Sequence, residues 1–514
     1  MAGGLSRRRL LKAAIPAGAL ALGALGAARY YISSKRKPNV IVLVADSMRS
    51  DHLGRQIDGA SITPYLDGLA SKSVLFRNTY SGASWTKCAM ASLFTGGFTP
   101  YHGVARGSGT LSSRCDTIAK MLKRHGYRTM GLVCNIWMAP ETRIKGGRTA
   151  DDYSYGFGQG FDDYHLVTPG EWGGAAESAW APADVMTGKA LKAVDGCREP
   201  YFLYVHYMDT HYPWVIMRPD SFTGRYSAPG EKNQWKVIRE NREIILSANW
   251  AGATDDPPDS HVTEENRKRL VAAVNESVGY VDSEVGRLLE QLRGAGALDN
   301  SVVIFASDHG EEYWERGHIG HGQSLYNEVV RVPLVISAPD LGARIVTEPV
   351  SSVGIYETIK DLCGLRDDVQ PVMAPSLAPY MEGRPPREPQ RLYSQLDGNA
   401  NGATLRKVVG ADGREIIVRN QAGSEDRVEV YDLKRDSGER TSLTAAAAED
   451  LMKTTKGITQ ECMAVAQELS IDRPVTSLAW QLAEEESTSG AKTGASSAQD
   501  QKMVDQMRAL GYLH

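Results

Sequence analysis

The chain has 514 residues, a length that corresponds to one large α/β domain with attachments or to two to four ordinary domains. Hydrophobic residues make up 42% and charged residues 23% of the sequence, which argues against a wholly disordered chain, a fibrous repeat or a membrane protein with many spans. The 58 basic residues nearly balance the 62 acidic ones, so the formal net charge of -4 gives no reason to expect a nucleic-acid partner. Six cysteines without a CxxC pair argue against a zinc knuckle or a disulfide-dense scaffold, although a single disulfide stays open.

The N-terminal segment is typical of a targeting signal rather than of a folded domain. Residues Ser6 to Lys12 read Ser-Arg-Arg-Arg-Leu-Leu-Lys, and an apolar, Ala/Gly-rich run follows from Ala13 to Ala28. This order resembles a twin-arginine export signal. The apolar run is shorter than the roughly 20 residues that span a bilayer. We therefore expect an exported protein, in the periplasm or at the cell surface, that uses the twin-arginine export machinery and touches the membrane only if the signal stays uncleaved.

Downstream of Lys37, short apolar runs rich in strand formers alternate with longer helical patterns. The predicted strands are Asn39–Ala45, Ser73–Thr79, Thr129–Cys134, Tyr201–Tyr207, Ser301–Ala306 and Val332–Ser337. Their near-continuous apolar character indicates burial on both faces, as in a parallel sheet. Apolar residues at steps of three and four predict a long amphipathic helix over Glu264–Arg293. The expected fold class is α/β, with a mostly parallel central sheet sandwiched by helices.

Two later segments depart from this pattern. The polar, irregular stretch from Tyr212 to Pro258 predicts an insertion over the carboxyl edge of the sheet, where it would set substrate selectivity. Apolar and polar residues alternate in Lys407–Arg419, on both sides of the turn sequence Ala411-Asp412-Gly413. This pattern predicts a β-hairpin within a small C-terminal α+β subdomain. The expected organisation is a signal or anchor plus linker at 1–37, the main domain at 38–383, the C-terminal subdomain at 384–483, and a flexible linker with a short terminal helix at 484–514.

Polar residues that can carry chemistry stand at three points of this pattern. Asp46 ends the first strand, Thr86 precedes a helical run, and Asp308 and His309 end a later strand. Each has a plainer explanation, because an Asp or Thr at such a place is often a helix cap and the later group can be a polar turn. The carboxyl ends of parallel strands meet at one edge of a sheet, so we expect the three points to converge there.

Taken in order along the chain, these residues resemble the sulfatase family of the alkaline-phosphatase superfamily. The resemblance is carried by Asn39-Val-Ile-Val-Leu-Val-Ala-Asp46 with Arg49, Asp51 and His52, by Thr63-Pro-Tyr-Leu-Asp67, by Ser84-Trp-Thr86 running into Ala91-Ser-Leu-Phe-Thr-Gly96, by His211-Tyr-Pro213, by Ser307-Asp-His-Gly310, by His321 with Ser324-Leu-Tyr326, by Arg331-Val-Pro333, and by Tyr431-Asp-Leu433. It implies that 38–383 is a catalytic domain for metal-dependent cleavage of a sulfate or phosphate ester. The substrate would be a small molecule or a group borne on a polymer.

The nucleophile position departs from the family pattern. Sulfatases carry a Cys or Ser, later oxidised to formylglycine, at the start of a Cys-x-Pro-x-Arg signature. Aligning on the helical run puts Thr86 there, with Cys88 and Met90 at the Pro and Arg positions, so we expect no formylglycine. A threonine hydroxyl can attack when a divalent cation lowers its pKa and a helix N-terminus helps hold the anion. Threonine at this place resembles the superfamily's nucleotide pyrophosphatases/phosphodiesterases, which favours a phosphoester.

The metal set departs as well. Ser47 stands where arylsulfatases have a second acid, which leaves it as a substrate-contacting or ligand-orienting candidate, and His309 replaces their Asn. An imidazole nitrogen favours Mn²⁺ or Zn²⁺ over Ca²⁺, which prefers all-oxygen cages. The sequence does not exclude Ca²⁺ or Mg²⁺ as the bound metal. The resemblance thus implies a one-metal site made by Asp46, Asp308, His309 and Thr86.

Three histidines and an asparagine complete the candidate set. In the resemblance, His211 matches a histidine near the leaving group and His321 falls near a lysine that contacts the transferred anion, so either can be a general acid or an anion clamp. His318 is a further candidate, for which an exposed loop histidine is the plainer alternative. Asn135 stands where related enzymes contact substrate, although a strand-end turn explains it as well. If the histidines are ligands, a second metal becomes possible.

We therefore expect an exported, metal-dependent hydrolase with Thr86 as nucleophile and His211 and His321 assisting. One alternative is a phosphoglycerol- or phosphoethanolamine-type transferase of the same superfamily, although those enzymes usually carry several membrane spans. The other is a catalytically inactive homologue that binds anionic polymers.

Overall fold

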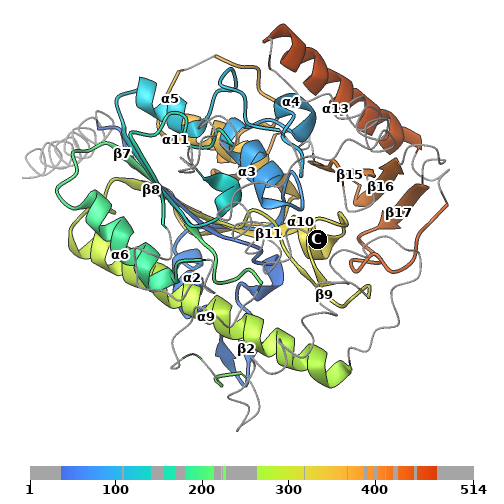
Figure 1. Ribbon diagram of the computed structural model, residues 1–514, viewed down its shortest axis with the longest axis horizontal. Helices are drawn as coiled ribbons and strands as arrows, with labels where there is room; N and C mark the ends of the chain where they lie inside the picture. Colours follow the sequence, from blue (N-terminus) through green and yellow to red (C-terminus); the bar gives the residue numbers. More distant parts are fainter. Residues whose placement is uncertain are drawn as a thin grey trace, which may run out of the picture.

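The computed structural model describes residues 36–471 except 107–108, 140–154, 168–179, 213–221, 223, 227–262, 318, 367–368, 387–389, 391, 399–402, 411, 421–426, 445–448 and 470 (Figure 1). The predicted export signal, most of the predicted insertion and the predicted terminal linker and helix lie outside the described residues. Within the described ranges, no helix combines the length and apolar character needed to cross a membrane.

A nine-stranded sheet forms the centre of the described fold. Its strands are β1 (Asn39–Ala45), β4 (Val74–Tyr80), β5 (Arg128–Val133), β6 (Asp163–Leu166), β7 (Tyr201–Tyr207), β8 (Ser301–Ala306), β11 (Arg331–Ser337), β12 (Arg344–Val346) and β13 (Val350–Ser351). The order is β12-β4-β11-β8-β1-β7-β5-β6, with β13 also paired to β4. Strands β8, β1, β7, β5 and β6 are parallel, and β11 is antiparallel to both neighbours. The six predicted strands are confirmed, each within one residue of its expected bounds.

The central strand β1 shows why the apolar runs become buried strands. Val40 and Val44 belong to one hydrophobic core, whereas Ile41 and Leu43 belong to the other, because successive side chains of a strand point to opposite faces. All seven residues of β1 are buried. The six cysteines are all free, so the disulfide that composition left open is not formed.

Helices cover both faces of the sheet (Figure 1). One layer contains α3 (Thr86–Thr95), α4 (Thr99–His102), α5 (Ile118–Arg124) and α11 (Ile355–Leu362); the other contains α2 (Pro64–Ala70), α6 (Ala183–Val194) and α9 (Glu264–Gly294). Shorter elements are η1 (Ser50–His52), β2 (Gln56–Ile57), β3 (Ala60–Ser61), η2 (Ile136–Met138), β9 (Glu312–Tyr313), β10 (Ile319–Gly320), α10 (Asn327–Val330), η6 (Ser352–Gly354) and α12 (Ala378–Met381). Helix α9 confirms the predicted amphipathic helix.

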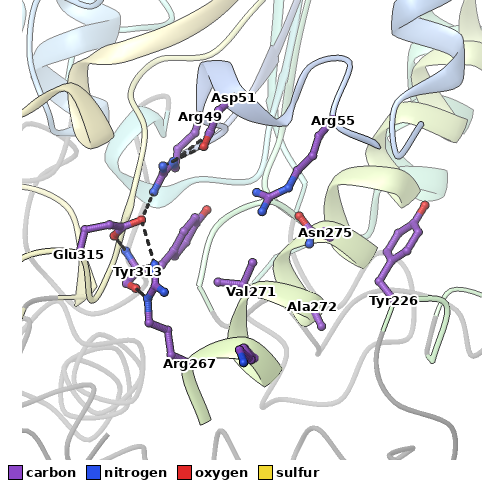
Figure 2. A pocket seen from close by; sticks show the side chains of 11 residues that line it. Arg49, Asp51, Arg55, Tyr226, Arg267, Val271, Ala272, Asn275, Tyr313 and Glu315 are labelled. Carbon is purple, nitrogen blue, oxygen red and sulfur yellow. Dashed lines mark hydrogen bonds and ion pairs between the residues drawn. The ribbon is translucent and has the colours of Figure 1, made fainter. Parts of the chain in front are cut away.

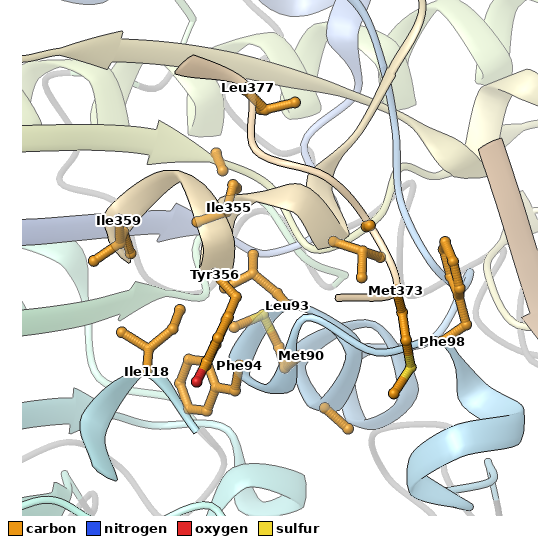
Figure 3. Close-up of a cluster of buried hydrophobic side chains, with 14 of the residues drawn as sticks. Met90, Leu93, Phe94, Phe98, Ile118, Ile355, Tyr356, Ile359, Met373 and Leu377 are labelled. Carbon is orange, nitrogen blue, oxygen red and sulfur yellow. The ribbon is translucent and has the colours of Figure 1, made fainter. Parts of the chain in front are cut away.

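Helix α3 is buried along its whole length, which fixes the position of its N-terminus. Figure 3 shows Phe94 of α3 beside Tyr356 of α11 in the core between the two helices. The helix ends at Gly96, whose φ of 65° is left-handed and where a Cβ would come within 2.9 Å of Tyr356. Glycine therefore lets α3 end tightly against α11.

A small antiparallel sheet and a helix form the C-terminal subdomain. The elements are β14 (Leu392–Leu396), β15 (Thr404–Val409), β16 (Arg414–Asn420), β17 (Arg427–Asp432) and α13 (Glu449–Glu468). The predicted hairpin is confirmed as β15 and β16. The buried Lys407 ammonium lies 2.7 Å from Glu439, 2.9 Å from Glu415 and 3.0 Å from the Asn327 side chain of α10. This buried network joins the subdomain to the main domain.

Candidate active site

Polar side chains from four neighbouring parallel strands meet at the carboxyl edge of the sheet. Asp46 directly follows β1, Asp308 and His309 follow β8, Asn135 follows β5, and His206 lies near the end of β7. All five are at most 2% exposed. Because these strands run in the same direction, segments far apart in the sequence deliver their side chains to one place.

The hydroxyl of Thr86 reaches this group from the N-terminus of α3. Its Oγ1 lies 3.4 Å from Asp46 Oδ2 and 3.2 Å from His309 Nε2, and the side chain is buried. The N-cap residue is Trp85, so Thr86 is the first residue of the helix and not its cap. The structure thus brings Thr86, Asp46 and His309 together. It also excludes the alternative that Thr86 is only a helix cap.

Ser47 holds the two carboxylates in place. Its hydroxyl donates to Asp46 Oδ1 at 2.9 Å, and its backbone N–H donates to Asp308 Oδ1 at 3.0 Å. The φ of Ser47 is 59°, in the left-handed region that a residue with a side chain adopts at a cost. Such backbone strain is tolerated where the surrounding structure requires it, often at functional sites. Ser47 therefore orients the carboxylates from a strained turn.

The donor atoms fit a divalent cation. Ligand atoms of Asp46, His206 and Asp308 all lie within 4.8 Å of one another. His309 Nε2 is 3.3 Å from Asp308 Oδ2 and 3.9 Å from Asp46 Oδ1. Asp308 Oδ2 is buried and has no hydrogen-bond partner among the described residues, although buried carboxylate oxygens are normally satisfied. Two carboxylates and two imidazoles are a donor set that suits one Mn²⁺ or Zn²⁺ ion.

The electrostatics of the two carboxylates are consistent with this fit. Burial opposes ionisation of Asp46, but the hydrogen bond with His206 and the nearby imidazoles outweigh it and lower its pKa. Burial raises the pKa of Asp308, and the negative charge of Asp46 raises it further. Two buried carboxylates this close resist being charged together. A cation between them stabilises the charged form of both.

His206 is the site residue that sequence reasoning missed. Its Nε2 lies 3.0 Å from Asp46 Oδ2, and its Nδ1 lies 2.6 Å from the hydroxyl of Tyr204, a contact that fixes the ring. The sequence shows only a histidine within an apolar predicted strand. Its position beside Asp46 depends on the pairing of β7 with β1, in which His206 lies opposite Val44. The available signal was a histidine one residue before the end of a buried strand.

The rings of the predicted assisting histidines, His211 and His321, lie beside the site. The ring centroids of His309 and His321 are 4.2 Å apart, and those of His321 and His211 are 4.9 Å apart. Burial lowers the pKa of both His211 and His321, which favours neutral imidazoles. His321 Nδ1 lies 2.9 Å from an oxygen of the buried Glu311, a second residue that sequence reasoning left without a role. Glu311 therefore fixes the ring of His321.

The remaining two candidates have different outcomes. Asn135 Nδ2 donates to Asp46 Oδ2 at 3.2 Å, while its Oδ1 accepts from the backbone of Trp137 at 3.0 Å. It therefore orients a carboxylate of the site as well as ending its strand. His318 lies outside the described residues.

A buried acid beside the site gives a prediction about stability and pH. Burial raises the pKa of Glu312 from 4.5 to about 8, despite a hydrogen bond from Ser324. Between these pH values the folded chain keeps a proton that the unfolded chain has lost, so the free energy of unfolding falls as pH rises from about 4.5 to about 8. Glu312→Gln should make this decrease in the free energy of unfolding smaller, by an amount on the order of a few kcal/mol. Urea unfolding at a series of pH values measures it.

Glu290→Gln, on the exposed face of α9, is the matched control and should leave the pH profile of stability unchanged. If Glu312→Gln and the parent chain show parallel profiles, Glu312 is not protonated in the folded state as described.

Comparison with known proteins gives the family. A family model described as Sulfatase matches residues 38–365. Choline-sulfatase of Rhizobium meliloti (strain 1021) is 25% identical over 437 residues, which cover 79% of this chain and 82% of that protein. The structure of a phosphonate monoester hydrolase of Agrobacterium radiobacter superposes with a TM-score of 0.63 at 22% identity, covering 84% of this chain and 96% of the other. A protein solved in complex with its substrate D-glucosamine-2-N,6-O-disulfate gives a TM-score of 0.62 at 18% identity, with 84% and 99% covered.

The family match spans well over half of the chain, and the superposed structures share its α/β fold. Enzymes of this family use a divalent metal, which agrees with the donor atoms of Asp46, His206 and Asp308. The chain is a sulfatase-like ester hydrolase, and it belongs to the sulfatase family of the alkaline-phosphatase superfamily.

Proposed function

We propose that this chain hydrolyses a phosphate or sulfate ester with Thr86 as the nucleophile, and that a phosphoester is the preferred substrate. One observation carries the proposal: the Thr86 hydroxyl lies 3.4 Å from Asp46 and 3.2 Å from His309, at the first residue of a buried helix. In the resemblance to the family, aligned on Ala91–Gly96, Thr86 stands at the nucleophile position.

Each group around Thr86 has a chemical task. A Mn²⁺ or Zn²⁺ ion held by Asp46, Asp308, His206 and His309 would supply the positive charge that lowers the pKa of the hydroxyl. The N-terminus of α3 favours negative charge, so its backbone N–H groups support the anion under attack. Attack by Thr86 Oγ1 forms a covalent ester on the threonine and releases the alcohol. Water then cleaves that ester and frees the anion.

His211 and His321 are the groups proposed to exchange protons in these two steps. Burial favours the neutral imidazole in both, so each ring offers one N–H and one acceptor nitrogen. A neutral imidazole can hydrogen-bond to the departing oxygen and accept a proton from the attacking water. The contact of His321 with Glu311 keeps its ring in one orientation.

The preference for phosphorus follows from the chemistry of threonine. A formylglycine hydrate has two hydroxyls, one of which can help to expel sulfate, whereas threonine has a single hydroxyl and forms a stable covalent ester. Phosphothreonine is a conventional intermediate that water can hydrolyse. The relatives include a choline-sulfatase and a phosphonate monoester hydrolase, so the family accommodates both classes of ester.

Export is a further part of the proposal. It is supported by the N-terminal sequence from Ser6 to Ala28, which has the order of basic and apolar residues of a twin-arginine signal. Export of a folded chain agrees with an enzyme that acquires its metal before it crosses the membrane. The proposed location is the periplasm or the cell surface.

A substrate panel tests the proposed reaction. Aryl phosphate monoesters, diesters, phosphonates and sulfates are assayed with Mn²⁺, Zn²⁺ and Ca²⁺ in turn. With Mn²⁺ or Zn²⁺, we expect kcat/KM for the best phosphoester to exceed that for the sulfate at least about tenfold, a difference of 1.4 kcal/mol in the barrier. An added alcohol should not appear in the product. Preference for the sulfate, strict dependence on Ca²⁺, or transfer to the alcohol would contradict the corresponding part of the proposal.

A further inference from the structure

A cavity lies next to the candidate active site but is lined by different residues. It has a volume of about 370 Å³ and lies between the turn that follows β1 and helix α9 (Figure 2). The lining residues are Arg49, Asp51, Arg55, Tyr226, Arg267, Lys268, Val271, Ala272, Asn275, Tyr313 and Glu315. The volume of the cavity, and its lining of both polar and apolar side chains, are typical of a small-molecule site.

The charges of the lining do not balance. Three arginines and one lysine face two carboxylates, which gives a formal charge of +2. Both carboxylates are already engaged: Arg49 pairs with Asp51 at 2.9 Å and with Glu315 at 2.6 Å, and Glu315 also lies 3.8 Å from Arg267. The surplus of positive charge therefore belongs to the other two cations of the lining.

Those two cations are Arg55 and Lys268. Among the described residues, neither side chain has a carboxylate within ion-pair distance or a hydrogen-bond acceptor. Figure 2 shows the guanidinium of Arg55 extending into the cavity toward Asn275. The charge of Arg55 acts on Asp51, but the Asp51 carboxylate is already paired with Arg49. The Arg55 guanidinium therefore favours a further anion, which can accept two of its N–H groups. The cavity thus presents two cations to an anionic group.

Asn275 adds a requirement for a hydrogen-bond donor. Its side chain is 4% exposed, and its Oδ1 has no hydrogen-bond partner within the described part of the chain. A buried amide oxygen without a partner is costly, and a ligand hydroxyl would satisfy it. On the same face of α9, Val271 and Ala272 offer an apolar surface against which a ring can pack.

We propose that this cavity binds a hydroxyl-bearing organic anion of the size of one acidic sugar, with Arg55 and Lys268 pairing with the anionic group and Asn275 Oδ1 accepting from a hydroxyl. The anionic group is a carboxylate, a sulfate or a phosphate. The proposal does not depend on Thr86 being a nucleophile, because the two sites share no residue.

The cavity is also connected to the candidate active site. The Arg49 guanidinium donates to the backbone oxygen of Glu311 at 3.3 Å, and the Glu311 carboxylate contacts His321. The segment from Asp308 to Glu315 therefore supplies ligands to one site and a wall to the other. A ligand in the cavity would rest against the segment that carries Asp308 and His309.

Calorimetric titration of the full chain tests the proposal. The probes are glucuronate, glucose 6-sulfate, glucose 6-phosphate, glucose and inorganic phosphate; the esters are titrated into a Thr86→Ala chain so that turnover cannot interfere. We expect at least one sugar anion to bind, with glucose and inorganic phosphate binding more weakly. Which sugar anion binds most tightly identifies the anionic group.

Variants assign the binding to this cavity. Arg55→Gln and Lys268→Gln should each weaken binding of the tightest-binding sugar anion about tenfold. Asn275→Leu should weaken its binding several-fold. Arg287→Gln, which removes a charge from α9 outside the cavity, is the matched control and should bind as the parent does. Lys268 is exposed, so its variant folds even if Arg55→Gln does not.

Three results would overturn the proposal. The first is that no sugar anion binds, and the second is that Lys268→Gln and Arg55→Gln both bind as tightly as the parent. The third is that inorganic phosphate binds as tightly as glucose 6-phosphate, which would remove the role given to Asn275.

Discussion

Thr86→Ala is expected to lower kcat by about three to five orders of magnitude, because it removes the oxygen that attacks the ester and leaves only binding and electrostatic stabilisation. The methyl group of alanine fits where the threonine side chain is buried, so the fold should be kept. Steady-state assays of the best aryl ester from the panel, with saturating metal, measure the effect. Thr86→Ser keeps a hydroxyl and should retain far more activity than Thr86→Ala.

The matched control is Thr95→Ala, at the other end of the same helix. Thr95 is buried and donates to the backbone oxygen of Ala91 at 2.7 Å, so the change removes a similar side chain about 13 Å from the site. Its kcat should stay near that of the parent. If Thr86→Ala keeps near-normal turnover, Thr86 is not the nucleophile.

Asp308→Asn is expected to weaken metal binding at least about 100-fold. Mutation of a residue that only orients a metal ligand already lowers metal affinity about 10- to 100-fold, and Asp308 is itself a proposed ligand. The change removes one of two buried carboxylates and with it much of the attraction for a cation. His206→Ala should weaken binding about 10 to 100-fold. The readout is the rise in Tm with increasing Mn²⁺ or Zn²⁺, which reports metal affinity without reference to activity.

Asp209→Asn is the control for this experiment. Asp209 is a buried carboxylate at the same sheet edge, its pKa is raised by burial to about 8, and it accepts a hydrogen bond from the backbone of Ala183 at 3.2 Å. It lies outside the donor group, so its metal-induced rise in Tm should match that of the parent. A parent-like response in Asp308→Asn would show that the cation is held elsewhere.

The sequence was most informative about the central sheet. Strands such as Asn39–Ala45 and Ser301–Ala306 are buried on both faces, so every residue after the first in each strand is apolar and the run is easily recognised in the sequence. The short strands β9 and β10 carry no such signal, because each has two residues and depends on a hairpin contact. The antiparallel direction of β11 was not predicted either, since direction depends on tertiary packing and not on hydrophobic pattern.

For the site, the sequence indicated residues whose motifs are local. Asp46, Thr86, Asp308 and His309 stand at strand or helix ends, where polar residues are conspicuous, and the structure brings them together. His206 was missed because an interior strand histidine acquires a role only through its neighbour β1. Such partners depend on strand order, which periodicity does not reveal.

Crystals grown with Zn²⁺ and measured at its absorption edge test the central claim most directly. The account predicts one strong anomalous peak among Asp46, His206, Asp308 and His309, with ligand distances of about 2.0–2.2 Å and the Thr86 hydroxyl beside the ion. A map with no peak there, or with the ion beyond reach of Thr86, would contradict it.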